Sequence, residues 1–289
     1  ISAGLDWLVE KSPVRNLEGD VIPNGFEVRR VKDKEHYAFV TDDYIPFQNI
    51  DAFKFSDEIV RAKDGMYETA GSLRKGAIIW LLMKLNDMIY IKNDVDEAVA
   101  KYMLLKMSHD TELALQVMAT PIRVVCMNTL RMAVAQGKNV FYAKHTSDIN
   151  SRVAEARATL GVVNRLYDTW AMGAEMMANK QVSESVIKQT LYTAFRQDIA
   201  MPMEAIYKPT QREMVAVRSL FEGQGKGLNH QSIKGSRYAL YNAVCEHIDF
   251  RDFRVKEPER RLNNVWFGSG VEVKNRAYDF LMQCPDIAE

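Results

Sequence analysis

Residues 67–85 read YETAGSLRKGAIIWLLMKL, and this stretch decides the fold class. Two strand-like segments, Tyr67–Leu73 and Ala77–Leu85, flank the short sequence Arg74–Gly76. A three-residue connection that contains glycine between two such segments is typical of a β-hairpin. The sequence therefore predicts an antiparallel hairpin whose tip carries two cations, Arg74 and Lys75.

Further strands are expected on both sides of this hairpin. Before it, turn clusters at 16–20 and 23–25 precede the strand-like segments Phe26–Val31 and Ala38–Val40, and a helix is expected from about residue 49 to Gly65. After it, the apolar segments Ala100–Met107 and Leu113–Met118 should form a second pair. These elements together indicate one antiparallel sheet.

A helix is predicted after Pro121. The missing N–H of proline is tolerated in the first turn of a helix, and the apolar residues of Ile122–Ala135 recur at helical spacing. Gly137 should end this helix, and Val140–Ala143 should form one more strand.

The clearest helix begins after Ser147 or Asp148, either of which can cap it. Its apolar residues alternate at spacings of four and three, which is a 3.5-residue repeat over about four heptads. These positions are Ile149, Val153, Ala156, Leu160, Val163, Tyr167, Trp170, Ala174 and Met177. The repeat predicts a helix of roughly 45 Å that packs along its own domain or against a second copy of the chain.

The C-terminal third is predicted to be mainly helical. Ser183 should cap a helix that runs to about Asp198, and Thr210 with Glu213 matches a capping box. Two more helices are expected over about 236–249 and 273–282. The fold class is therefore α+β: an antiparallel β-sheet with a hairpin packed against a long helix, plus a helical C-terminal third. We expect an α+β core over residues 1–180 and a mainly helical part over 181–289, joined as one continuous unit.

Composition restricts the environment and the chemistry. The chain has 289 residues, a formal net charge of +0 and only 3 cysteines, which lie far apart. This indicates a reducing compartment, here the cytoplasm of a host cell, and neither a disulfide framework nor a zinc pattern. No apolar run reaches the length of a membrane span. Because the sequence opens at Ile1 instead of Met, further residues or a removed leader upstream are compatible with it.

Several motifs resemble those of one protein family. In chain order they are Tyr67–Leu73, Ser108–Asp110, Thr120–Leu130, Lys144–Thr146, Tyr241–Val244 and Trp266–Gly270. They resemble successive motifs of the phage- and plasmid-related family called domain of unknown function 932, over nearly the whole chain. The resemblance implies a context of phages, prophages and plasmids, and no reaction.

The element order is similar to a second group, at the level of fold alone. Single-strand annealing recombinases of the RecT, Redβ and Rad types also combine a helix, a hairpin, further strands and a long helix. Those proteins form rings or filaments that hold a DNA strand in a basic groove beside the hairpin. By this analogy, the chain is expected to form a homo-oligomer of that kind.

Charge is distributed unevenly despite the zero total. Residues 1–60 carry 7 Lys and Arg against 12 Asp and Glu, whereas the segment 121–165 carries only Asp148 and Glu155 against 7 cations. Those cations are Arg123, Arg131, Lys138, Lys144, Arg152, Arg157 and Arg165. Such a segment suits the tracking of phosphates, and an ordinary solvated helix face is the alternative. A further alternative is that the acidic and basic parts of neighbouring subunits attract each other.

We therefore predict a DNA-binding surface built from the hairpin tip and the basic segment. Its expected members are Arg74, Lys75, Lys106, His109, Arg123, Arg131, Lys138, Tyr142, Lys144, His145 and Arg152. Tyr142 would stack on a base, with a core position as the alternative. Arg123 lies in an apolar stretch and must meet either a carboxylate or an anion.

Enzymatic alternatives have weaker motifs. The histidines lack metal-ligand spacing, but His109, Asp110 and His145 could form a carboxylate–histidine set acting on nucleic acid or a nucleotide. The acidic pairs at 94–97 and 249–252 could bind Mg²⁺, although exposed acidic turns are commoner. The Gly223–Gly227 loop lacks the order of a phosphate loop.

The leading hypothesis is thus a non-enzymatic, cofactor-free protein that binds and anneals single-stranded DNA in recombination. The first alternative is a metal-dependent enzyme that acts on nucleic acid or a nucleotide. The second alternative is a protein-interaction module that counters a host factor through an exposed apolar stripe on the helix after Ser147.

Overall fold

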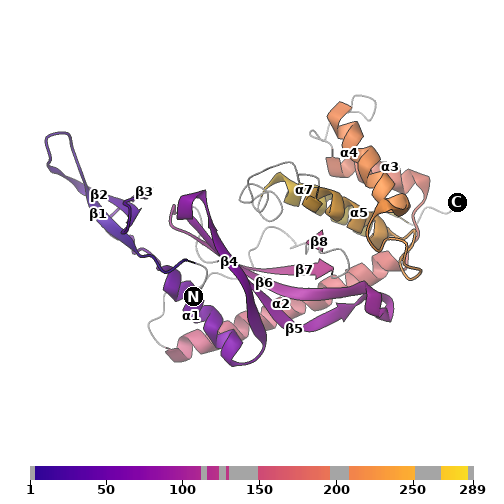
Figure 1. The fold of residues 1–289 in the computed structure, drawn as a ribbon, viewed down its shortest axis with the longest axis horizontal. Helices are drawn as coiled ribbons and strands as arrows, with labels where there is room; N and C mark the ends of the chain where they lie inside the picture. The colour runs from indigo at the N-terminus through magenta and orange to yellow at the C-terminus, as the bar shows by residue number, and fades with distance from the viewer. Residues whose placement is uncertain are drawn as a thin grey trace. The chain divides into compact units, whose positions relative to one another are not determined.

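The computed structural model describes residues 4–111, 116–123, 128–129, 149–195, 208–250 and 268–285. Within these ranges the chain contains two β-sheets and a set of helices that dominates its C-terminal third, so the α+β prediction is confirmed (Figure 1). The chain forms two compact units, each assembled from separate segments. The first unit takes residues 1–86, 102–119 and 137–164, and the second takes 87–101, 120–136 and 165–289.

The N-terminal residues form a three-stranded antiparallel sheet, which we call the arm. It consists of β1 (Val9–Arg15), β2 (Val21–Arg30) and β3 (His36–Val40), in the order β1-β2-β3 (Figure 1). The predicted turn cluster at 16–20 lies between β1 and β2, whereas the turn predicted at 23–25 is wrong, because these residues belong to β2. Val9 and Val28 are buried, whereas much of the remaining strand surface is partly or fully exposed.

The predicted hairpin is confirmed. The helix α1 (Asn49–Arg61) precedes β4 (Gly65–Leu73), and β5 (Ile78–Tyr90) pairs antiparallel with β4 from Leu73↔Ile78 onward. A short turn, η1 (Arg74–Gly76), connects the two strands. The apolar run Ile78–Met83 is buried throughout, which explains why this stretch forms a core strand.

The sheet continues in the order β4-β5-β6-β7-β8. Two short turns, η2 (Ile91–Asn93) and η3 (Val95–Glu97), lead into β6 (Ala98–Ser108), and β7 (Gln116–Arg123) follows as its neighbour. The predicted pairing of residues 100–107 with residues 113–118 is therefore confirmed over the described part.

The predicted helix start at Pro121 is wrong. Pro121, Ile122 and Arg123 belong to β7, and Ile122 pairs with Thr129 of the two-residue strand β8 (Asn128–Thr129). Proline is tolerated near the end of a strand, and an apolar run fits a buried strand as well as a buried helix. The expected strand at 140–143 lies outside the described residues.

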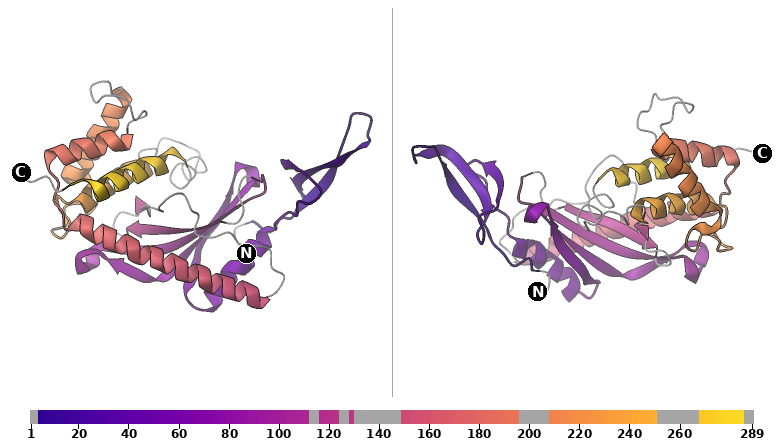
Figure 2. Two further views of the ribbon diagram at one scale, coloured as in Figure 1. Left: turned by 180° about the vertical axis from the view of Figure 1, so that it is seen from behind. Right: turned by 45° about the horizontal axis from the view of Figure 1, so that its top comes forward.

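The long helix is confirmed as α2 (Ile149–Ala178), which runs without interruption in Figure 2. Its predicted apolar stripe points into the protein where its side chains are described. The buried members are Val163, Tyr167, Trp170, Ala174 and Met177. The stripe is therefore core from Val163 to Met177, while the side chains of Ile149, Val153 and Ala156 lie outside the described set.

Helices fill the described part of the C-terminal third. They are α3 (Glu184–Phe195), α4 (Lys208–Ser219) with the π-helical turn η6 (Leu220–Gln224), α5 (Arg237–Phe250) and α7 (Ser269–Gln283). The Ser183 hydroxyl accepts a hydrogen bond of 3.3 Å from the Val186 N–H, so the predicted cap of α3 is confirmed. The predicted capping box is wrong, because Thr210 lies inside α4.

Buried and half-buried charges hold these helices together. The Arg276 guanidinium donates to the Ala194 carbonyl at the end of α3, at 3.0 and 2.7 Å. The Lys274 ammonium of α7 forms an ion pair with Asp249 of α5, and the two side chains are 0% and 5% exposed. A charged pair this deeply buried makes the packing of α5 against α7 dependent on both partners.

Candidate nucleic-acid interface

The tip of the β4–β5 hairpin has an unusual backbone. Arg74, Lys75 and Gly76 have φ angles of 51°, 55° and 98°, all in the left-handed region, and the Ala77 N–H closes the turn on the Arg74 carbonyl at 3.0 Å. Non-glycine residues adopt this region at an energetic cost. A Cβ at Gly76 would lie 2.8 Å from the Tyr37 hydroxyl, so only glycine fits there. The turn is thus pressed closely against the arm.

Both cations of the tip are accessible, and both meet carboxylates. The side chains of Arg74 and Lys75 are 54% and 78% exposed. Arg74 lies 3.4 Å from the Asp110 carboxylate, and Lys75 lies 3.4 Å from the Glu35 carboxylate. Exposed pairs of this length are weak, so a competing anion can replace the carboxylate.

Aromatic side chains of the arm lie beneath the turn. The Arg30 guanidinium stands 5.1 Å from the centre of the Trp7 ring, and Asp33 holds it with two hydrogen bonds of 2.7 Å, which raise the pKa of Arg30. The Tyr37 hydroxyl donates to the Lys75 carbonyl at 3.4 Å, and burial raises its pKa to about 12. Trp7 and Tyr37 are both partly exposed. We call Trp7, Arg30, Tyr37, Arg74 and Lys75 the tip cluster.

His109, which is predicted to contact DNA, is buried in the structure and does not lie on the accessible surface. Its ring is 0% exposed, with its centre 5.6 Å from that of Tyr37 and 5.3 Å from that of Trp7. Its Nε2 lies 2.9 Å from the Asn49 Oδ1, and burial lowers its pKa to about 4, against the opposing charge of Asp110. A neutral, buried imidazole cannot contact a phosphate. His109 therefore supports the tip cluster from below.

Lys106 is buried as well, at 8% exposure in β6, so it does not extend the accessible basic surface as predicted. The other predicted DNA-binding residues are described only in part. Arg123 lies in β7 and Arg152 in α2, while their side chains fall outside the described set. The remaining predicted members are wholly outside it: Arg131, Lys138, Tyr142, Lys144 and His145. The structure thus brings together Arg74, Lys75 and the buried His109.

Sequence reasoning missed the two aromatic members and Arg30 of the tip cluster. Trp7 comes from the segment before β1, Arg30 ends β2, and Tyr37 lies in β3. Their separation along the chain leaves no motif. The available signal was the combination of aromatic and basic residues within the first forty positions, where 6 Lys and Arg are offset by 7 Asp and Glu, so no cationic excess marks the region.

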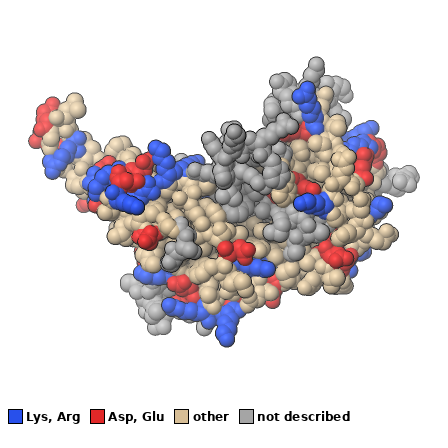
Figure 3. All heavy atoms as spheres, in the orientation of Figure 1, with Lys and Arg blue, Asp and Glu red and all other residues tan. Residues whose placement is uncertain are grey.

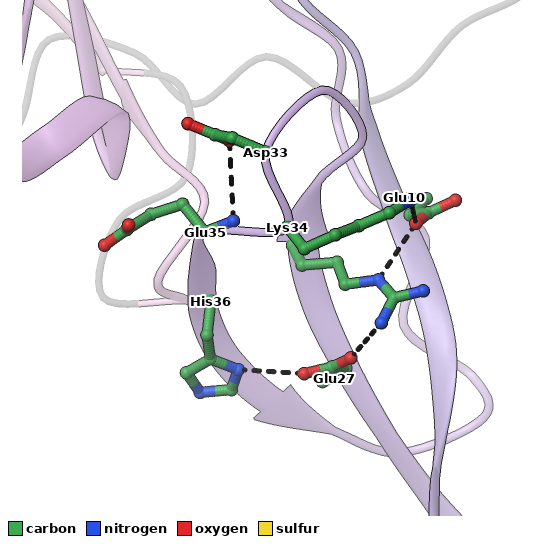
Figure 4. A network of polar contacts seen from close by, with 7 residues as sticks. Glu10, Glu27, Asp33, Lys34, Glu35 and His36 are labelled. Carbon is green, nitrogen blue, oxygen red and sulfur yellow. Dashed lines mark hydrogen bonds and ion pairs between the residues drawn. The ribbon is translucent and has the colours of Figure 1, made fainter.

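One face of the arm carries a balanced ionic network (Figure 4). Glu10 accepts from Arg29 at 2.9 Å and from Lys34 at 2.8 Å, while Glu27 accepts from Arg29 at 2.7 Å and lies 3.3 Å from the His36 ring. These bonds lower the pKa of Glu10 and raise that of Arg29. Acidic and basic side chains are likewise intermixed on the face seen in Figure 3. This network links three strands and does not form a cationic patch.

A carboxylate–histidine pair occurs elsewhere, in the second unit. The Glu97 Oε1 lies 2.9 Å from the His230 Nδ1, with the Glu97 side chain fully buried and that of His230 32% exposed. Asp94 begins the same turn, and its carboxylate accepts a hydrogen bond of 3.0 Å from the Asp96 N–H. The pair fastens the turn before β6 to the segment before α5. In the described ranges, no three side chains of His, Cys, Asp or Glu are grouped to hold a metal ion.

Comparison with known proteins identifies the family. The fold and the tip cluster define an α+β protein with a cation-bearing hairpin. A sequence model of the family "Domain of unknown function (DUF932)" matches residues 36–266, which is most of the chain, and the protein belongs to this family. No curated protein and no solved structure matches it. None of the helices within the described ranges has the length and apolarity to cross a bilayer.

Proposed function

We propose that this protein binds single-stranded DNA through the tip cluster, without catalysing a reaction. The observation that carries the proposal is the hairpin tip itself, where two exposed cations extend from a turn whose backbone packs against the partly exposed Trp7 and Tyr37 side chains. Cations that follow the backbone, combined with rings on which unpaired bases stack, are the common means of binding a single strand.

The proposal extends to strand annealing in recombination. The order of helix, hairpin, further strands and long helix is similar to that of the annealing recombinases, and the family resemblance implies a phage or plasmid setting in the host cytoplasm. A ring or filament of copies would place successive tip clusters along one strand and leave its bases free to pair. In this proposal the basic segment 121–165 extends the surface beyond the tip.

Neutralising the tip cations should weaken binding. We expect Lys75→Gln to reduce the affinity for a fluorescent single-stranded oligonucleotide roughly fivefold at low salt, and Arg74→Gln/Lys75→Gln roughly tenfold or more. The slope of log affinity against log salt should fall by about 0.7 for each phosphate that the variant no longer neutralises. Fluorescence anisotropy across a salt series, with single- and double-stranded DNA, measures both quantities.

Lys188 provides the matched control for this experiment. It is also an exposed lysine, at 62%, and it also pairs with a carboxylate, that of Glu184 at 3.7 Å on α3. Lys188→Gln therefore removes the same charge from the second unit, outside the tip cluster, and should leave the affinity nearly unchanged. Equal reductions in Lys75→Gln and Lys188→Gln would contradict a site at the tip. A complementary-oligonucleotide annealing assay that shows no acceleration over buffer would contradict the annealing role.

One observation favours the interaction-module alternative. The arm exposes large apolar side chains, including Leu17 at 103%, Phe39 at 71% and Ile45 at 75% after β3. Exposed apolar groups on a narrow sheet are typical of protein contacts. A pull-down from host lysate, compared with that of a Phe39→Ser variant, tests this second candidate. Loss of a retained protein in the variant would support it.

The metal-dependent enzyme remains the other alternative. Its predicted set of His109, Asp110 and His145 includes a buried imidazole, which has no access to a substrate in this structure. Incubation with labelled DNA and Mg²⁺ or Mn²⁺, repeated with His109→Ala, decides this alternative. Activity that survives the substitution would exclude that set.

A further inference from the structure

We infer that Asp110 and Glu35 are built-in counterions of the tip cluster, which restrict it to ligands with several successive phosphates. This inference rests on the proposed function and concerns the regulation of the same site. Each exposed cation of the tip already has a carboxylate at 3.4 Å. A phosphate group must therefore replace that carboxylate before it can bind.

The two carboxylates are held in place independently of the cations. Asp110 follows β6, and its side chain is only 14% exposed. The preceding residue is fixed, because the His109 N–H donates to the Ala77 carbonyl at 2.7 Å and its ring contacts the Trp7 and Tyr37 rings. Asp110 thus stays beside Arg74 whether or not a ligand is present.

Glu35 is fixed by the turn between β2 and β3. Its backbone carbonyl accepts a hydrogen bond of 2.9 Å from the Arg30 N–H, and its side chain is 33% exposed. Lys75, by contrast, is exposed and has a long flexible stem, so it can move to a new anion while Glu35 remains. The Glu35 carboxylate, which is one-third exposed, then faces water in place of Lys75.

This arrangement determines how many phosphate groups a ligand needs. The counterions come from different segments of the chain, so a single phosphate that replaces one of them leaves the other pair intact. An oligonucleotide replaces both with neighbouring phosphates, and its second phosphate binds at a high effective concentration. The tip cluster should therefore discriminate a phosphodiester chain from inorganic phosphate and from mononucleotides.

Removing a counterion should strengthen the binding of DNA. We expect Glu35→Gln and Asp110→Asn each to increase the affinity for a single-stranded oligonucleotide roughly threefold at low salt, with a steeper salt dependence. Both replacements keep the size of the side chain, and thermal denaturation verifies that each variant folds. The double variant Glu35→Gln/Lys75→Gln should bind like Lys75→Gln alone, since the counterion matters only through its cation.

Glu184→Gln is the control in the second unit, because it removes one exposed carboxylate that pairs with Lys188 and with Arg218 and is not part of the tip cluster. If Glu35→Gln and Glu184→Gln raise the affinity for DNA equally, the effect comes from net charge alone, and the inference is overturned. Suppose that the wild type binds DNA and that Lys75→Gln weakens this binding, but that neither Glu35→Gln nor Asp110→Asn raises the affinity. This result would overturn the inference and leave the proposed function intact. If the wild type binds no single strand at all, the proposed function fails first. If inorganic phosphate competes as effectively as an oligonucleotide at the same total phosphate concentration, the predicted need for several successive phosphates is contradicted.

Discussion

Lys274→Met should lower the free energy of unfolding by about 3 kcal/mol or more. Lys274 and Asp249 form an ion pair between α7 and α5 with 0% and 5% side-chain exposure. The substitution keeps most of the side-chain volume but leaves the Asp249 carboxylate without this cation in a site that water does not reach. Equilibrium unfolding in urea, followed by circular dichroism, measures the change.

The double variant Lys274→Met/Asp249→Leu separates the ion pair from the packing. Replacing both charges by apolar groups removes the buried carboxylate together with its cation, so much of the stability should return. If the free energy of unfolding of Lys274→Met lies within about 1 kcal/mol of the wild-type value, the Asp249 carboxylate is satisfied without Lys274.

Acidification should destabilise the first unit through His109. Burial lowers its pKa from 6.5 to about 4, so the unfolded chain takes up a proton on this imidazole at a higher pH than the folded chain does. Stability therefore falls as the pH drops through the window between these two values. For a pKa difference of this size, the loss between pH 7 and pH 5 is about 2 kcal/mol.

His109→Gln tests this assignment. The glutamine amide can still donate to Asn49, but it does not titrate. The variant should show a smaller loss of stability between pH 7 and pH 5 than wild type, even if it is less stable at neutral pH. Identical pH dependence in both proteins would show that another group is responsible. Thermal unfolding over a pH series provides the comparison.

The elements that the sequence predicts correctly have local signals. The hairpin at residues 67–85 combines two apolar segments with a glycine-containing turn, and α2 has a heptad repeat long enough to exclude a strand. The prediction for the segment after Pro121 is wrong because its apolar residues satisfy a helical and a buried-strand pattern equally. Pairing with β8, which is a tertiary effect, favours the strand over the helix at Ile122.

The candidate site could be predicted only in part, for a related reason. Arg74 and Lys75 follow from the turn that presents them. Their counterions Asp110 and Glu35 lie more than 30 residues away along the chain. The polarity of histidine favours a surface position for His109, and its burial depends on the aromatic rings of the distant arm. Contacts of this kind arise from the fold and leave no spacing in the sequence.

The position of β3 affects how fragments of this family are designed. The matched region begins at residue 36, the first residue of β3. A recombinant fragment cut there would keep the outer strand of the arm and discard β2, its hydrogen-bonded neighbour. It would also uncover the His109 ring and deprive the Asn49 amide of its acceptors, the Leu5 and Trp7 carbonyls. A fragment that starts before Leu5 would preserve these contacts, whereas one that follows the family boundary should aggregate or lose the arm.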